Sequence, residues 1–290
     1  MTVPNENNFC GGAFDDWLEV MLTPKCNGKC EWCVERNGFH PKHKARVGEL
    51  IDIIHRNAAK KVILLGGEPT LYKHLRELVS ALGQPHDAWI QGQEVFTMPP
   101  KKVYLTTNGH SFNADFVAEN LSLLTGVNVS IHHYGLECNK GITGITLDEN
   151  TIEDAVIACR RNNITVRFNC NIIKGEVDSW GGITRFIKWA QERGVTSVRF
   201  SELMGDGRKF ISLVDVVPYS ETYGLSENPY VKGCNQNAEI LGSRVNFRQM
   251  CGIQTECRVT PINPKSVNVK KVLYYDGKYY NGWQSQRRQQ

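Results

Sequence analysis

Residues 17–33 read WLEVMLTPKCNGKCEWC, an apolar run followed directly by three cysteines. The run WLEVMLT is typical of a buried strand, and Cys26, Cys30 and Cys33 follow it with the spacing C-x3-C-x2-C. Thiolates are the usual ligands of iron–sulfur clusters, and three of them would leave one iron of a cubane cluster open to a small molecule. Zinc sites usually show two CxxC pairs, or one CxxC with a His pair, and the sequence has no second pair of this kind. Three unrelated thiols in a turn are the alternative.

A second motif follows the expected strand KKVILL at 60–65, which runs into GGEPTL at 66–71. Gly66 and Gly67 permit positive φ and close approach of the backbone to a ligand. Glu68 places a carboxylate at the carboxyl end of the strand. An ordinary βα turn is the alternative use of this sequence.

The two motifs together resemble the radical S-adenosylmethionine (SAM) superfamily. The resemblance implies that the three cysteines hold a [4Fe–4S] cluster whose open iron is chelated by the amino and carboxylate groups of SAM. Trp32 matches the aromatic residue that the family places before the third cysteine. The family's GGEP motif, whose backbone and carboxylate receive the SAM amino group, is matched by Gly66, Gly67, Glu68 and Pro69.

Strand and helix signals alternate along the next part of the chain. Strands are expected at 17–23, 60–65, 102–109, 127–133, 164–175 and 196–207, and helices from about Pro41 to 58 and at 71–83, 113–125, 150–162 and 182–193. Such alternation predicts an α/β fold with a parallel sheet. We therefore expect a partial (β/α)6 barrel of the TIM type over residues 17–207, after an N-terminal extension at 1–16.

Two segments fall outside this alternation. Residues 84–100, QPHDAWIQGQEVFTMPP, read as an irregular connection whose Trp89 and Phe96 plug the bottom of the barrel or meet a partner. Residues 208–290 are expected to form a small C-terminal cap. Within it, VLYYDGKYYNGW predicts a β-hairpin around Asp276 and Gly277.

Polar side chains on the expected strands share one face, because successive strand residues point to opposite sides. Ser130 and His132 share a face in the fourth strand, and Arg167, Asn169 and Asn171 share a face in the fifth. Buried polar groups need hydrogen-bonding partners, which a ribose and a carboxylate would supply; mutual pairing is the alternative. In the sixth strand, Arg199 is a candidate clamp for a carboxylate or phosphate.

The family resemblance extends to these positions. Thr107 and Asn108 resemble its turn after the third strand, and Ser130 resembles its serine near the SAM methionine or ribose. The expected SAM contacts are Trp32, Gly66, Gly67, Glu68, Pro69, Thr107, Asn108, Ser130, Asn169 and Arg199. The expected substrate contacts are His132, Arg167, Asn171 and Glu202.

From the fourth strand onward the segments VNVSIHH, ITG, VRFNCNIIKG and VRFSELMGDG resemble the cyclase that opens molybdopterin synthesis from GTP. The resemblance stops after residue 207, because that subgroup has a CxxC, a further cysteine and a final double glycine. Here the C-terminal region offers Cys234, Cys251 and Cys257, and the chain ends RRQQ. These three cysteines are either ligands of an auxiliary cluster or core thiols. Cys159 is expected to be a core thiol.

The composition limits the partners and the cellular compartment that we expect for this chain. The net charge of +4 is too mild to demand nucleic acid as a partner, and no apolar run approaches the length of a membrane span. The N-terminal sequence MTVPNENNFCGG does not resemble a signal peptide. Ten cysteines in such a chain argue for reduced thiols and metal binding, so we expect a cytoplasmic, oxygen-sensitive protein.

The leading functional hypothesis is an enzyme that cleaves SAM reductively and takes a hydrogen atom from a small molecule, such as a nucleotide or amino-acid derivative. An electron donor such as flavodoxin or ferredoxin is then expected, and Cys10, Cys138 or a C-terminal cysteine is a candidate hydrogen donor. One alternative is a modifier of a peptide or a nucleic-acid base. The other is a non-catalytic protein that binds an iron–sulfur cluster and SAM.

Overall fold

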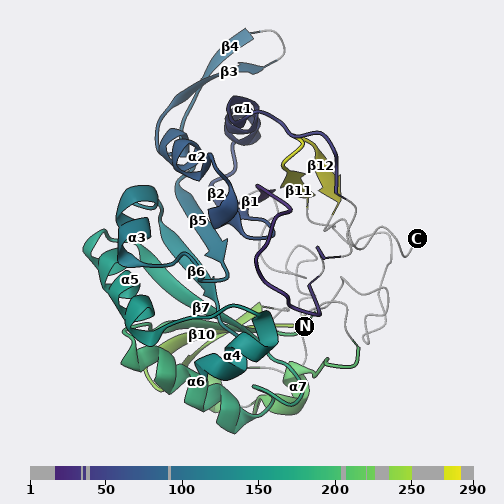
Figure 1. The fold of residues 1–290 in the computed structure, drawn as a ribbon, viewed down its shortest axis with the longest axis vertical. Helices are drawn as coiled ribbons and strands as arrows, with labels where there is room; N and C mark the ends of the chain where they lie inside the picture. Colours follow the sequence, from purple (N-terminus) through teal and green to yellow (C-terminus); the bar gives the residue numbers. More distant parts are fainter. Residues whose placement is uncertain are drawn as a thin grey trace, which may run out of the picture.

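The computed structural model describes residues 17–33, 35–36, 40–90, 93–203, 207–219, 221–225, 235–249 and 271–281. In this part of the chain ten strands form one curved sheet in the order β12-β11-β1-β2-β5-β6-β7-β8-β10-β9 (Figure 1). The strands are β1 (Trp17–Met21), β2 (Lys61–Leu65), β5 (Lys102–Thr107), β6 (Gly126–Ser130), β7 (Thr165–Asn171), β8 (Ser197–Ser201), β9 (Asn235–Ile240), β10 (Ser243–Arg248), β11 (Lys271–Tyr274) and β12 (Tyr279–Asn281).

All neighbours from β11 to β10 pair in parallel, and the edge strands β12 and β9 pair antiparallel. The helices are α1 (Val47–Asn57), α2 (Leu75–Leu82), α3 (Ala114–Asn120), α4 (Leu136–Thr143), α5 (Glu149–Arg161), α6 (Trp180–Glu192) and the short α7 (Leu213–Val216). This arrangement confirms the predicted α/β partial barrel. Within the described residues no helix is long and apolar enough to cross a membrane.

The two faces of the sheet differ in character. One set of alternating residues, including Val20, Leu64 and Phe200, joins the large apolar cluster that packs against the helices. The other set faces the inside of the curve, where Met21, Leu65 and neighbouring apolar side chains form a smaller cluster and the remaining positions are mostly polar. The strand alternation expected from the sequence therefore separates core from interior.

The C-terminal part of the chain joins the barrel sheet. β10 pairs in parallel with β8, and β11 pairs in parallel with β1. The expected hairpin forms from β11 and β12, with Gly277 at φ 79° in its turn. The sheet thus continues beyond residue 207, and the hairpin is one edge of it instead of a separate layer.

The prediction of an irregular segment at 84–100 was wrong. Residues His86–Ile90 form β3 and Gln93–Thr97 form β4, an antiparallel hairpin that projects from the body beside α1 (Figure 1). Trp, Ile, Val and Phe in these strands are β-formers, and this signal outweighs the polar residues between them. Phe96 is 66% exposed and does not plug the barrel; the side chain of Trp89 lies outside what the structure describes.

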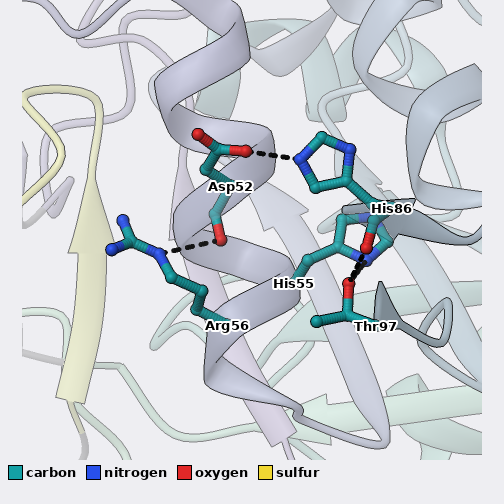
Figure 2. Close-up of polar contacts among 5 residues, drawn as sticks. All are labelled: Asp52, His55, Arg56, His86 and Thr97. Atoms are coloured by element: carbon teal, nitrogen blue, oxygen red, sulfur yellow. Dashed lines mark hydrogen bonds and ion pairs between the residues drawn. The ribbon is translucent and has the colours of Figure 1, made fainter. Parts of the chain in front are cut away.

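Side chains of α1 hold this hairpin (Figure 2). His86 Nε2 contacts Asp52 Oδ1, and Thr97 Oγ1 lies 3.2 Å from His55 Nδ1. Thr97 Oγ1 also donates to His86 O at 2.6 Å. Burial lowers the pKa of His55, with the neighbouring His86 as the second cause. The hairpin is therefore attached through polar contacts on one side, and Phe96 lies on the exposed remainder.

Candidate active site

The cysteine loop that follows β1 is held by backbone hydrogen bonds on two sides. On the side of β2, Gly67 N donates to Thr23 O at 2.7 Å. On the side of α4, Lys29 N donates to Thr143 O at 2.6 Å. These contacts tie the loop to the carboxyl ends of the strands, which is where barrels of this type carry their sites.

The two glycines of residues 66–69 are required by the cysteine loop itself. A Cβ on Gly66 would lie 2.7 Å from Thr23 O, and one on Gly67 would overlap Lys25 O and lie 2.7 Å from Pro24 O. Since Cβ atoms do not approach oxygen so closely, the backbone of the second motif packs directly against the backbone that carries the cysteines.

The three thiols of the loop influence one another. The pKa of Cys30 is raised to about 11. Burial is the largest cause, and the neighbouring Cys33 and Cys26 are the next. Burial also raises the pKa of Cys26, although Gly28 N donates to its Sγ at 3.2 Å. Arg36 lowers the pKa of Cys30 only in part, and three thiols close enough to influence one another fit a thiolate-ligated cluster. Among the described residues, no group of three or more His, Cys, Asp or Glu side chains is arranged to hold a single metal ion. A cubane cluster does not require such an arrangement, because each thiolate would bind a different iron.

Glu68 joins the second motif to the end of β5. Its Oε1 accepts from Thr70 N at 3.1 Å, Thr70 Oγ1 at 2.8 Å and Thr107 Oγ1 at 2.6 Å, and its Oε2 accepts from Asn108 N at 2.7 Å. The carboxylate is 1% exposed. Glu68 and Thr107, both expected as SAM contacts, therefore contact each other and fix two neighbouring turns.

Asn108 extends this network to the cysteine loop. Its Nδ2 donates to Asn27 Oδ1 at 2.7 Å and lies 4.0 Å from Cys26 Sγ. A continuous set of hydrogen bonds thus links β2, β5 and the cysteines. This link was not expected from the sequence, because it depends on which strands become neighbours.

Polar side chains form a row across four adjacent strands. Ser130 pairs in register with Asn169, Asn169 with Arg199, and Arg199 with Asn246. Asn169 Oδ1 is buried and has no hydrogen-bond partner among the described residues. A buried acceptor without a donor costs free energy, so the row fits a ligand that supplies a hydroxyl or amino group.

His132 lies just beyond β6, since the strand ends at Ser130 and not at the expected residue 133. Its Nδ1 accepts from Asn171 N at 3.1 Å, which places the proton of the neutral ring on Nε2. Burial lowers the pKa of His132 to about 4. The ring meets the indole of Trp32 edge-on, with centroids 5.5 Å apart. His132 is thus a neutral hydrogen-bond donor next to the cysteine loop.

Two expected substrate contacts have protein partners. Arg167 Nε donates to Ser197 Oγ at 3.1 Å, deeper in the barrel than Asn169. Glu202 Oε1 accepts from Leu213 N at 2.8 Å and so binds the start of α7. Glu202 is therefore engaged structurally, and a substrate role for it stays a prediction.

The remaining cysteines divide into two groups. Cys138 is exposed on α4, whereas Cys159 and Cys170 are buried on the helix side of the sheet, as expected of Cys159 as a core thiol. The residues Cys10, Cys234, Cys251 and Cys257 lie outside the described residues. An auxiliary cluster stays a prediction.

Sequence reasoning missed the contribution of β10. Asn246 and Arg248 alternate with Val245 and Phe247, which belong to the helix-side core. The same alternation marked the fourth and fifth strands, so the signal was present in SRVNFR. It was overlooked because this segment follows residue 207, where the expected barrel ends.

Comparison with known families matches residues 20–201 to the Radical SAM superfamily, more than half of the chain. The chain belongs to the radical SAM superfamily. The matched residues run from β1 to the end of β8 and contain the cysteine loop, Glu68 and the polar row up to Arg199. Members of this superfamily use a [4Fe–4S] cluster and SAM, and the donors described above fit both.

Curated relatives of this radical SAM protein include two GTP 3′,8-cyclases. The one from Hydrogenovibrio crunogenus is 30% identical over 209 residues, covering 69% of this chain and 58% of the relative. The one from Aquifex aeolicus is 28% identical over 198 residues, covering 66% of this chain and 57% of the relative. The chain thus spans somewhat more than half the length of these relatives.

Solved structures support the fold. SuiB from Streptococcus suis matches with a TM-score of 0.52 and 16% identity over 72% of this chain and 44% of SuiB. SuiB bound to S-adenosylmethionine matches with a TM-score of 0.50 and 17% identity, over 72% of this chain and 42% of that one. At this identity the likeness concerns the barrel alone.

Proposed function

We propose that this radical SAM protein is an enzyme that takes a hydrogen atom from a small molecule bound inside the barrel. The observation that carries the proposal is the continuous network from Cys26 through Asn108 to Glu68. It fixes the cysteine loop against two strand ends, which is the preorganisation that a cofactor site needs. A loop of unrelated thiols would not require this support.

When bound, a [4Fe–4S] cluster and SAM supply one-electron reductive cleavage of the sulfonium to methionine and a 5′-deoxyadenosyl radical, which abstracts hydrogen from the substrate. The protein's part is to bind, orient and exclude water. Glu68 and the backbone of residues 66–69 are the proposed contacts of the SAM amino group. Ser130 and the buried acceptor Asn169 Oδ1 are the proposed contacts of its ribose or methionine. An external flavodoxin or ferredoxin is the proposed electron donor.

The small-molecule substrate is favoured by the inner face of β7, β8 and β10. Arg199 and Asn246 lie next to each other there, beyond the SAM contact Asn169, and are at least half-buried. Such convergent polar groups inside a barrel are typical of a site that encloses its ligand. The curated relatives, whose names give GTP as their substrate, make a nucleotide one candidate of this class.

Deuterium transfer tests the proposal. The reconstituted protein is incubated with SAM, dithionite and extract from cells grown in heavy water, divided into a low-molecular-weight fraction and a macromolecular fraction. We expect deuterated 5′-deoxyadenosine with the low-molecular-weight fraction, and loss of the product in the Cys26→Ala variant. Deuterium transfer from the peptide or RNA fraction alone would overturn the small-molecule assignment in favour of a macromolecular substrate.

A further inference from the structure

An unusual concentration of arginine lies on the inner face of β7, β8 and β10. Arg167, Arg199 and Arg248 occupy inward positions on three adjacent strands, because the residues that alternate with them belong to the helix-side core. β10 pairs with β8 so that Arg199 faces Asn246 and Ser201 faces Arg248. Neighbouring strands lie about 4.8 Å apart, so the guanidinium groups share one wall of the barrel.

This wall has too little negative charge to balance it. None of the three arginines forms an ion pair with a carboxylate among the described residues. Burial lowers the pKa of Arg199 to about 9, with Arg167 and Arg248 as the next causes and Glu19 as a partial counterweight. Buried charge without a counter-charge is costly, so this wall favours an anion.

Asn246 orients Arg199 toward such an anion. Arg199 Nε donates to Asn246 Oδ1 at 2.7 Å. Asn246 Nδ2 in turn donates to Gln236 O at 3.2 Å and Asn237 Oδ1 at 3.0 Å, which fixes the amide with its oxygen toward the guanidinium. Nε is thereby used, while the terminal nitrogens of Arg199 have no protein acceptor among the described residues. A guanidinium held in this way presents its fork to an oxyanion.

The wall lies away from the strands that carry the cysteine loop. In the sheet, β8 and β10 are separated from β1 and β2 by β5, β6 and β7. Apart from Arg199, the expected SAM contacts lie on strands β1, β2, β5, β6 and β7 or in the loops that directly follow them. Moreover, Asn246 and Arg248 on β10 lie outside residues 20–201, the part of the chain that matches the superfamily.

We propose that Arg199 and Arg248, with Asn246 as a positioning residue, form a subsite for a phosphate group of the substrate. The proposal rests on the proposed function, because it names the substrate class of the same barrel. A phosphate is favoured over a single carboxylate because its two charges and three free oxygens match two guanidinium groups. The substrate is accordingly a phosphorylated small molecule whose anionic end binds β8 and β10.

Binding of inorganic pyrophosphate to the reconstituted protein tests the subsite at constant ionic strength by calorimetry. We expect Arg199→Gln and Arg248→Gln each to weaken pyrophosphate binding about tenfold or more, since each removes a charge-assisted contact. Arg248→Lys should retain part of the affinity. Arg76→Gln is the matched control, because Arg76 is exposed on α2, and it should bind as the unchanged protein does.

Malonate and SAM are the discriminating ligands. Equal binding of malonate and pyrophosphate would overturn the phosphate assignment in favour of a general carboxylate site. Unchanged pyrophosphate binding in both arginine variants would overturn the subsite, and lowered SAM affinity in Arg199→Gln alone would assign that arginine to SAM. Release of 5′-deoxyadenosine by the same proteins is measured in parallel. If it is formed while the phosphate subsite is overturned, the proposed function is still supported.

Discussion

Replacing Glu68 by glutamine tests the network that holds the cysteine loop. Each carboxylate oxygen accepts one backbone N–H: Thr70 N binds Oε1 and Asn108 N binds Oε2. A glutamine side chain has only one acceptor oxygen. In either orientation of its amide, one of these N–H groups loses its acceptor and faces an NH2 group. A threonine hydroxyl can rotate and either donate or accept a hydrogen bond. A backbone N–H can only donate, so the conflict remains.

The expected cost follows from the lost contact. A hydrogen bond to a charged group contributes about 1.5–3 kcal/mol, and the site is 1% exposed, so water does not replace it. We expect Glu68→Gln to lower the free energy of unfolding by about 2–3 kcal/mol. For a domain of this size the melting midpoint should fall by roughly 4–12 °C.

Thermal and urea unfolding of the cluster-free protein measures this effect without any contribution from SAM. Glu119→Gln is the control, because Glu119 is exposed on α3, and it should change stability by less than about 0.5 kcal/mol. A Glu68→Gln protein as stable as the control would refute the reasoning. A weakened SAM affinity in that case would leave Glu68 as a ligand contact alone.

Three further predictions concern other parts of the molecule. Gly67→Ala should displace the cysteine loop and lower the iron content after reconstitution, whereas Gly48→Ala on α1, where a Cβ meets nothing within 4 Å, should retain full iron; equal iron contents would contradict the packing. The folded-state pKa of His132, about 4, lies below its ordinary 6.5. The contribution of His132 to the free energy of unfolding is therefore complete above pH 6.5 and is lost as the pH falls toward 4, at about 1.4 kcal/mol per pH unit. Urea unfolding against pH should show a smaller slope in His132→Asn, and an unchanged slope would disprove the assignment. Phe96→Ser should alter stability by no more than about 0.5 kcal/mol, and a loss of several kcal/mol would mean that this ring is packed.

The sequence predicted the barrel and much of its inner face because both follow from local patterns. Alternation of polar and apolar residues placed Ser130, Asn169 and Arg199 on one side of their strands, and the sheet register brings them into one row. The partners of Glu68 were not predictable in this way. They depend on β2 and β5 becoming neighbours, which a single sequence does not specify.

The missed elements have a common physical cause. The segment 84–100 contains a hairpin whose second strand, β4, is almost entirely exposed, so it lacks the apolar face that marks a buried strand. β10 was overlooked because it enters the sheet after β8 by pairing in parallel, far from the motifs that identify the superfamily. The arginine wall depends on this pairing, since Arg248 joins Arg199 only when β10 lies beside β8.

The most direct test of the central claim is the release of 5′-deoxyadenosine from SAM by the reconstituted, reduced protein. We predict formation of 5′-deoxyadenosine and methionine by the unchanged chain, and none by the variant with Cys26→Ala, Cys30→Ala and Cys33→Ala. A protein with its full complement of iron and sulfide that forms no 5′-deoxyadenosine with SAM and dithionite, with or without the low-molecular-weight fraction, would contradict the account.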